Sequence, residues 1–182
     1  LGSDFVYASA RGSAPTGPGQ LDLDELLLLY RFRSIGTESR LYGIVGHPVT
    51  GSLSPTLHNT HLSRTGIDGV YAPFEERFLS RFVRAAREME IDGFSVTRPH
   101  KEDILSYVDR VDEESAAIGA ANTIALQERR WTAYNTDVDG VVVPLLRRTG
   151  VTGRRAVILG AGGAARAAAL GLRRRGAEIV VL

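Results

Sequence analysis

Apolar and polar positions along the chain group into blocks that fit strands and helices in turn. Short apolar runs bounded by glycine or polar residues predict strands, since strands buried on both faces of a sheet lack a polar side. Longer stretches with apolar residues three and four apart predict helices. The predicted strands are residues 5–8, 41–46, 70–75, 93–97, 122–126, 131–134, 154–160 and 177–182. The predicted helices are residues 22–30, 55–65, 78–89, 99–108, 113–118, 138–148 and 163–175.

This alternation predicts an α/β fold with a mostly parallel sheet, interrupted by a hairpin around the polar turn QERR. The last strand–helix–strand unit has only two strands, which is too few for a doubly wound sheet. We therefore expect the natural chain to continue. Residues 179–182 are then expected to form an exposed sheet edge, where another chain could pair or swap.

Composition narrows the classes of function. The 182 residues are 43% hydrophobic and 24% charged, which is ordinary for a soluble globular protein. A net charge of +1 gives no indication of a nucleic-acid partner or an acidic membrane. No apolar run approaches the roughly 20 residues of a membrane span, and no signal-peptide pattern is present. We expect a cytoplasmic protein that binds a small molecule.

Metal and thiol chemistry are disfavoured. The chain has no cysteine, which excludes disulfides, thiolate nucleophiles and cysteine-ligated zinc. Its four histidines lack the HExxH spacing and an accompanying acidic cluster. We therefore predict no metal site.

A glycine-rich loop joins the predicted strand 154–160 to the predicted helix 163–175. Its sequence GAGGAAR supplies Gly160, Ala161, Gly162, Gly163 and Ala164, with an alanine at the third position of the GxGxxG pattern. Glycines let a pyrophosphate approach the backbone, and the helix N-terminus offers free N–H groups to the anion. A glycine turn that binds nothing is the alternative, but the flanking elements favour nucleotide binding.

The segment GFSVTRPHK predicts a buried strand that stops at a helix start, with Lys101 close to the strand end. Ligands of open α/β sheets bind at such ends. A lysine there can give a proton to an oxygen that is becoming negative. Taken alone, a lysine at this position is most often a solvated surface residue.

Further polar residues also stand where strands end and helices begin. Ser52 and Ser54 follow the strand 41–46, Asn122 opens a strand, and Asp137 precedes a helix. Taken alone, Ser54 and Asp137 are explained as helix N-caps.

Together these motifs resemble shikimate dehydrogenase. The matching pieces are GHPVTGSLSPTLHN, GFSVTRPHK, GAANT, YNTDVDG and VILGAGGAARA, in the order and at the spacing of that family. The preceding residues, with FVYA, TGPGQ and a leucine-rich helix, resemble the end of a type I 3-dehydroquinate dehydratase. The whole resembles the junction of a bifunctional enzyme. It implies a dehydratase-like segment at 1–38, a shikimate-binding domain at 39–139 and the start of an NADP-binding Rossmann domain at 140–182.

The resemblance implies reversible NADP-dependent reduction of 3-dehydroshikimate to shikimate by the full-length protein, in aromatic amino-acid biosynthesis. Lys101 and Asp137 match the catalytic pair of the family. Ser52, Ser54, Ser95, Thr97 and Asn122 match substrate-binding positions, and Ser95 stands where asparagine is frequent. The dehydratase's Schiff-base lysine belongs to a part that this sequence lacks. We therefore expect no dehydratase activity, and no dehydrogenase turnover from these 182 residues alone.

Two alternatives stay open. One is a non-catalytic sensor of shikimate or quinate related to fungal repressors, although the presence of both Lys101 and Asp137 argues against it. The other is a quinate/shikimate dehydrogenase that uses NAD. The residue that reads the ribose lies about 20 positions after the glycine loop, at or beyond Leu182, so the sequence leaves NADP and NAD undecided.

Overall fold

The computed structural model describes residues 6–17 and 19–182. It contains a six-stranded sheet in the order β2-β1-β3-β5-β6-β4 and a two-stranded sheet β7-β8. The strands are β1 Arg40–Gly46, β2 Gly69–Glu75, β3 Gly93–Val96, β4 Arg110–Val111, β5 Thr123–Gln127, β6 Arg130–Tyr134, β7 Arg155–Ile158 and β8 Glu178–Val181. The α-helices are α1 Ser54–Thr65, α2 Leu79–Glu88, α3 Glu113–Ile118, α4 Asp137–Leu146 and α5 Gly163–Arg174.

The large sheet is mixed but mostly parallel, which confirms the predicted fold class. Strand β1 pairs in parallel with β2 and β3, and β4 pairs in parallel with β6. Strand β5 runs antiparallel to both β3 and β6. The reversal arises from the predicted hairpin, whose turn holds Glu128 and Arg129 at positive φ. Consequently β1, β3 and β6 end at the same edge of the sheet, and β5 begins there.

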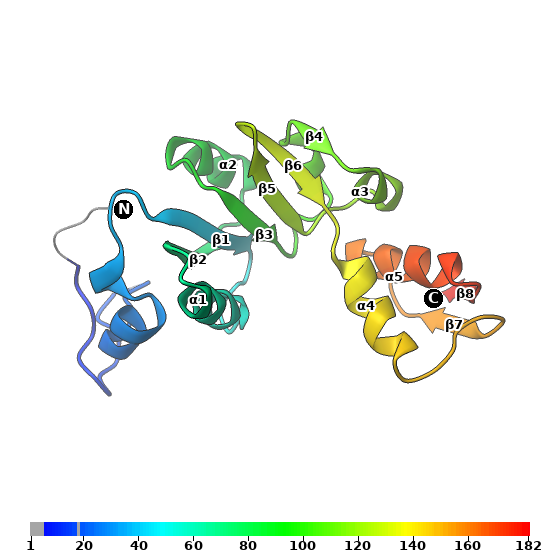
Figure 1. The fold of residues 1–182 in the computed structure, drawn as a ribbon, viewed down its shortest axis with the longest axis horizontal. Coiled ribbons are helices and arrows are strands. Elements are labelled where there is room, and N and C mark those ends of the chain that lie inside the picture. Colours follow the sequence, from blue (N-terminus) through cyan, green and yellow to red (C-terminus); the bar gives the residue numbers. More distant parts are fainter. Residues whose placement is uncertain (1–5, 18) are drawn as a thin grey trace.

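Helices cover both faces of this sheet, because successive side chains of a strand point to opposite sides. Helix α2 lies on one face, where Phe82, Phe94 and Trp131 form the centre of the larger core. Helix α1 lies on the other face, where Leu62 packs with Ile44 and Tyr71. Figure 1 shows the sheet between the two helices.

The C-terminal part begins with α4 and continues through β7, α5 and β8, which lie together at one end of the molecule (Figure 1). Helices α4 and α5 pack closely at Gly171, where an added Cβ would lie 2.6 Å from Val142 Cγ2 and 2.9 Å from Val138 Cγ1. In β8, Val181 is 50% exposed. This exposure agrees with the expected open sheet edge.

Two predictions in the N-terminal region are wrong in detail. Residues 6–8 form no strand, and Phe5 lies outside the described residues; the chain instead makes an isolated bridge between Ser9 and Asp22. The segment 22–30 is helical, but Glu25–Leu29 is wound as a π-helix in which Tyr30 N–H donates to the carbonyl of Glu25. The register of hydrogen bonds therefore differs from the α-helix that the leucine pattern predicted.

The predicted helix 99–108 is also wrong, since only a 3₁₀ helix, Asp103–Ser106, forms there. An α-helix would need the Lys101 carbonyl to accept from Leu105, but that carbonyl accepts from Ala121 N–H at 2.8 Å. Leu105 N–H bonds to Glu102 instead. A tertiary hydrogen bond to the segment before β5 thus takes the acceptor that the helix would have used.

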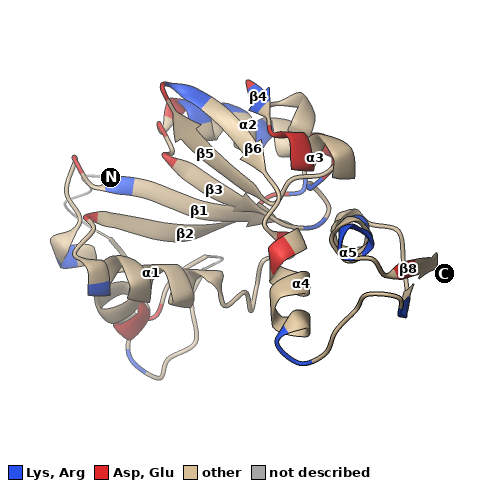
Figure 2. Ribbon diagram, turned by 45° about the vertical axis from the view of Figure 1, so that its right-hand side comes forward, with Lys and Arg blue, Asp and Glu red and all other residues tan. Residues whose placement is uncertain are grey.

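Charge is dispersed along the chain. Figure 2 shows basic and acidic positions interspersed, in keeping with a net charge of +1. Within the part of the chain that the structure describes, no helix combines the length and apolarity needed to cross a bilayer.

Candidate active site

One edge of the large sheet collects the polar residues that the sequence singled out. Ser52 and Ser54 follow β1, Thr97 follows β3, and Asp137 follows β6. Asn122 immediately precedes the antiparallel strand β5, so it lies at this same edge. The predicted catalytic and substrate-binding residues are all half-buried, which leaves them accessible to a ligand yet held in place.

The centre of the site is an ion pair between residues 36 positions apart. Lys101 Nζ donates to Asp137 Oδ2 at 2.5 Å, with side chains 19% and 22% exposed. Asn122 Nδ2 donates to the other carboxylate oxygen, Asp137 Oδ1, at 2.7 Å. Each oxygen of the carboxylate therefore has its own donor, and Lys101 is a paired, half-buried residue rather than a solvated one.

Hydrogen bonds around the backbone of Asp137 explain how its carboxylate is oriented toward Lys101. Asp137 is the first residue of α4, and the N-cap position belongs to Thr136, so the N-cap explanation of Asp137 is wrong. Asp137 N–H donates to Asn135 Oδ1 at 3.0 Å, and Asn135 Nδ2 donates to the Ala120 carbonyl at 2.9 Å. The buried Asn135 thus ties the start of α4 to the segment that carries Asn122, and the Asp137 side chain is free to face Lys101.

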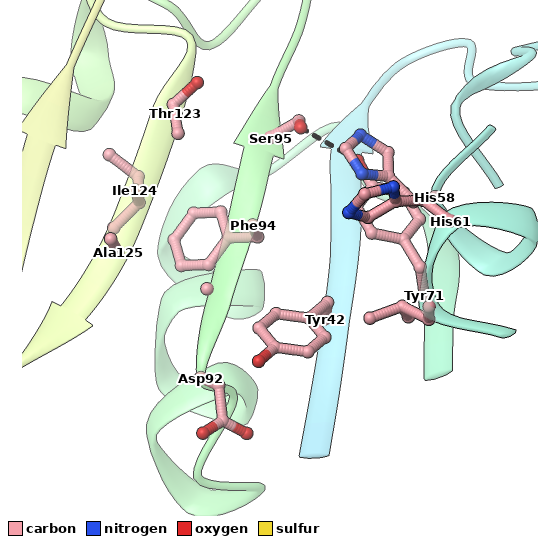
Figure 3. A pocket seen from close by; sticks show the side chains of 12 residues that line it. Tyr42, His58, His61, Tyr71, Asp92, Phe94, Ser95, Thr123, Ile124 and Ala125 are labelled. Carbon is pink, nitrogen blue, oxygen red and sulfur yellow. Dashed lines mark hydrogen bonds between the residues drawn. The ribbon is translucent and has the colours of Figure 1, made fainter. Parts of the chain in front are cut away.

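A second group of hydroxyls lies at the start of α1 and along β3. The N-cap of α1 is Leu53, so the N-cap explanation of Ser54 is also wrong. Ser54 N–H instead donates to Ser52 Oγ at 3.3 Å. On the neighbouring strands, the Tyr71 hydroxyl donates to Ser95 Oγ at 2.8 Å. Figure 3 shows this bond at one end of a cavity of ≈ 240 Å³ on the α1 face of the sheet.

Two aromatic rings form a wall of that cavity. The rings of His58 and Tyr71 stack with centroids 4.2 Å apart and an interplanar angle of 13°. Burial raises the pKa of Tyr71, while hydrogen bonds with Ser95 and Ser54 act in the opposite direction. Partial burial and the neighbouring His61 lower the pKa of His58. Both side chains are therefore neutral near pH 7.

The glycine loop lies against the ion pair. A Cβ added to Gly163 would approach Ala120 Cβ to 3.0 Å and Lys101 Cβ to 3.5 Å, so the first turn of α5 packs directly on the Lys101 segment. Gly160 has φ +103°, a conformation that favours glycine. Positions 160 and 162 face open space, and the N-cap of α5 has no side-chain hydrogen bond. The loop therefore leaves open space beside the N-terminus of α5.

Known proteins are similar to this chain in sequence and fold. Residues 44–124 match the family described as the shikimate dehydrogenase substrate binding domain. The NADP(+) shikimate dehydrogenase of Shouchella clausii is 40% identical over 148 residues, which cover 79% of this chain and 54% of the relative. The chain is thus similar to NADP-dependent shikimate dehydrogenases, and its residues 44–124 match their substrate-binding domain.

Two further relatives show how much of each protein this chain matches. The solved shikimate 5-dehydrogenase from Thermus thermophilus, in complex with NADP(H) and shikimate, is 35% identical with a TM-score of 0.71, over 78% of this chain and 55% of that one. The bifunctional chloroplastic 3-dehydroquinate dehydratase/shikimate dehydrogenase of Arabidopsis thaliana is 35% identical over all of this chain and 33% of its own length. The chain spans about half the length of the monofunctional relatives.

Sequence reasoning missed the contacts that three residues make beside Ser95: Tyr71, His58 and Asn59. The alternation of side chains along a strand could have assigned Tyr71 to one face of β2. It could not have identified Ser95, on β3, as the hydrogen-bond partner of Tyr71. Asn59 bonds to both the N–H and the carbonyl of Tyr71, at 2.9 and 2.7 Å. Such a clamp between a helix and a strand leaves no local pattern in the sequence.

Proposed function

We propose that this chain carries the substrate side, and the beginning of the cofactor side, of an enzyme that reversibly reduces 3-dehydroshikimate to shikimate with NADPH. The observation that carries the proposal is the half-buried Lys101–Asp137 pair beside the first turn of α5. Relatives named as NADP-dependent shikimate dehydrogenases support it. The pathway is then that of aromatic amino-acid biosynthesis.

The chemistry that bound NADPH supplies is transfer of a hydride to the ketone carbon. Lys101 stabilises the negative charge that develops on the ketone oxygen and donates the proton that completes the alcohol. Asp137 holds the ammonium of Lys101 and accepts from Asn122, which keeps the pair in one orientation. In the reverse direction, Lys101 accepts the proton from the alcohol.

The choice of lysine supports a proton-transfer role. The chain has 22 Lys and Arg residues, of which Lys101 is the single lysine. Arginine keeps its proton in proteins, whereas a lysine amine can give up and regain one. A cation needed only for charge could be an arginine, as at every other basic position of this chain.

Substrate recognition is assigned to hydroxyl and amide groups at the same edge. We propose that Ser52, Ser54, Ser95, Thr97 and Asn122 hydrogen-bond the carboxylate and hydroxyls of the substrate. A small polyhydroxy acid requires such partners, because each buried polar group left unpaired costs about 1–3 kcal/mol. The half-buried state of these five residues is consistent with this role.

The dinucleotide is assigned to the glycine loop. Residues Gly160, Ala161, Gly162, Gly163 and Ala164 would hold its pyrophosphate at the N-terminus of α5. We propose NADP as the dinucleotide, on the strength of the relatives named for it. Turnover measured with NADPH and with NADH tests this choice.

We further propose that residues 1–38 belong to a dehydratase unit joined to the dehydrogenase, with the substrate domain at 39–139 and the Rossmann domain starting at 140. The Arabidopsis bifunctional enzyme supports this proposal, since its similarity extends over the full length of this chain. The coding sequence upstream of residue 1 in the natural gene tests it: a complete type I dehydratase sequence is expected there.

Substitution of Lys101 in the intact natural protein tests the central assignment. Lys101→Ala is expected to lower kcat about 10²–10⁴-fold while shikimate affinity changes only a few-fold. Lys101→Arg is the matched variant, because it keeps a cation that cannot release its proton; it too is expected to lose turnover. Near-normal kcat in Lys101→Ala would overturn the proposal, and near-normal kcat in Lys101→Arg would reduce the role of Lys101 to charge alone.

A further inference from the structure

Tyr71 occupies an unusually constrained position next to the hydroxyls assigned to the substrate. It lies in β2 with its ring on the α1 face of the sheet, and it is 4% exposed. Asn59 of α1, itself buried, bonds to the backbone of Tyr71 on both sides, and the ring of His58 stacks on the phenol. Backbone and ring are thus both fixed, which leaves the hydroxyl in one place.

That hydroxyl connects two elements of the site. It donates to Ser95 Oγ on β3 at 2.8 Å, and Ser54, at the start of α1, lies near enough to lower its pKa. Burial raises the pKa of Tyr71, so the phenol keeps the proton it donates. Because one lone pair of Ser95 Oγ accepts from Tyr71, the hydroxyl hydrogen of Ser95 points away from Tyr71 and can be donated to another group.

We propose that Tyr71 is a positioning residue that sets the donor direction of Ser95 for recognition of the substrate's carboxylate and hydroxyl groups. In this proposal Tyr71 itself touches no substrate; it acts through Ser95. A serine hydroxyl rotates freely unless a neighbour fixes it, and a site for an anion needs the hydrogen directed at the ligand. This inference rests on the proposed function, since it deepens the substrate side of that same site.

His58 and Asn59 take part as supports of Tyr71. The stacked imidazole covers one face of the phenol, and the Asn59 clamp holds the strand against α1. Figure 3 shows His58 and Tyr71 on the side of the cavity opposite Thr123 and Ala125.

The experiment compares Tyr71→Phe with Tyr42→Phe in the intact natural protein. Tyr42 is a matched control, because it lies opposite Tyr71 on β1, lines the same cavity and pairs with Gly93 rather than Ser95. For Tyr71→Phe we expect KM for shikimate, and its dissociation constant by calorimetry, to rise about five- to tenfold, with kcat within about twofold of wild type. Tyr42→Phe is expected to change neither constant.

A double-mutant cycle isolates the coupling. Because Tyr71 acts through Ser95, the variant Tyr71→Phe/Ser95→Ala is expected to bind shikimate about as weakly as Ser95→Ala alone. Additive losses, or an unchanged dissociation constant in Tyr71→Phe, would overturn the positioning role. A loss of kcat equal to the loss of affinity would also count against it, since that outcome indicates general damage to the site.

Different results would refute the proposed function and the positioning role of Tyr71. A wild-type protein that binds shikimate but does not oxidise it refutes the proposed function and leaves the calorimetric cycle as the test of Tyr71. A wild-type protein that does not bind shikimate at all refutes both.

Discussion

Replacing Asp137 by asparagine removes one charge from the half-buried pair while keeping the shape of the side chain. In the wild type, Asp137 Oδ2 accepts from Lys101 and Oδ1 accepts from Asn122. An asparagine has one acceptor oxygen and one NH₂ group, so either Lys101 or Asn122 must face a donor. The substitution therefore leaves a half-buried polar group without its partner.

The expected loss of stability follows from these contacts. A hydrogen bond to a charged group contributes about 1.5–3 kcal/mol net, and the side chains of this pair are 19% and 22% exposed. Loss of an acid from the first turn of α4 costs about 0.3–1 kcal/mol through the helix dipole. We expect Asp137→Asn to lower the free energy of unfolding by about 2–3 kcal/mol, measured by urea denaturation at pH 7 with an unchanged m-value.

Asp139→Asn is the matched control. Asp139 lies in the same first turn of α4 but is exposed, so its loss removes only the dipole contribution of about 0.3–1 kcal/mol. We expect kcat for shikimate oxidation to fall about 10²-fold or more in Asp137→Asn and to stay near wild type in Asp139→Asn. Equal losses of stability in the two variants, or full turnover in Asp137→Asn, would refute the reasoning.

Two further predictions concern packing and pH. Gly171→Ala places a Cβ 2.6 Å from Val142, so we expect it to lower the free energy of unfolding in urea by about 1–3 kcal/mol. The matched variant Gly140→Ala places its Cβ in open space on α4 and is expected to raise the free energy of unfolding by up to about 1 kcal/mol. A change of the same sign in Gly171→Ala and Gly140→Ala would contradict the described packing of α4 on α5. The pKa of His58 is lower in the folded state than its ordinary value of 6.5, so the unfolded state takes up a proton at a higher pH than the folded state does. The free energy of unfolding is therefore expected to fall as pH drops below 6.5, and to keep falling until pH reaches the lowered pKa. In urea titrations from about pH 5 to 8, His58→Phe should remove that part of the pH dependence, and an identical profile in the variant would show that His58 does not cause it.

Much of the secondary structure could be predicted from the sequence, because it depends on the local pattern of apolar residues and on glycines at the ends of helices and strands. The apolar run of β1, the Gly66 end of α1 and the hairpin β5–β6 were all predicted, since each depends on neighbouring residues. Strand β4 was missed, because its two residues form a strand only by pairing with β6. The helix predicted at 99–108 failed for a related reason, since Ala121 takes the carbonyl of Lys101.

The candidate site divides in the same way. The sequence by itself determined which polar residues stand at strand ends and helix starts, including Lys101, Asp137 and Asn122, together with the glycine loop that precedes α5. Only the tertiary structure decided that Lys101 and Asp137 meet across 36 residues, and that the Tyr71 hydroxyl donates to Ser95. The physical reason is that a side chain's hydrogen-bond partner depends on strand order and register, which are set by the packing of the whole sheet and not by the residues on either side.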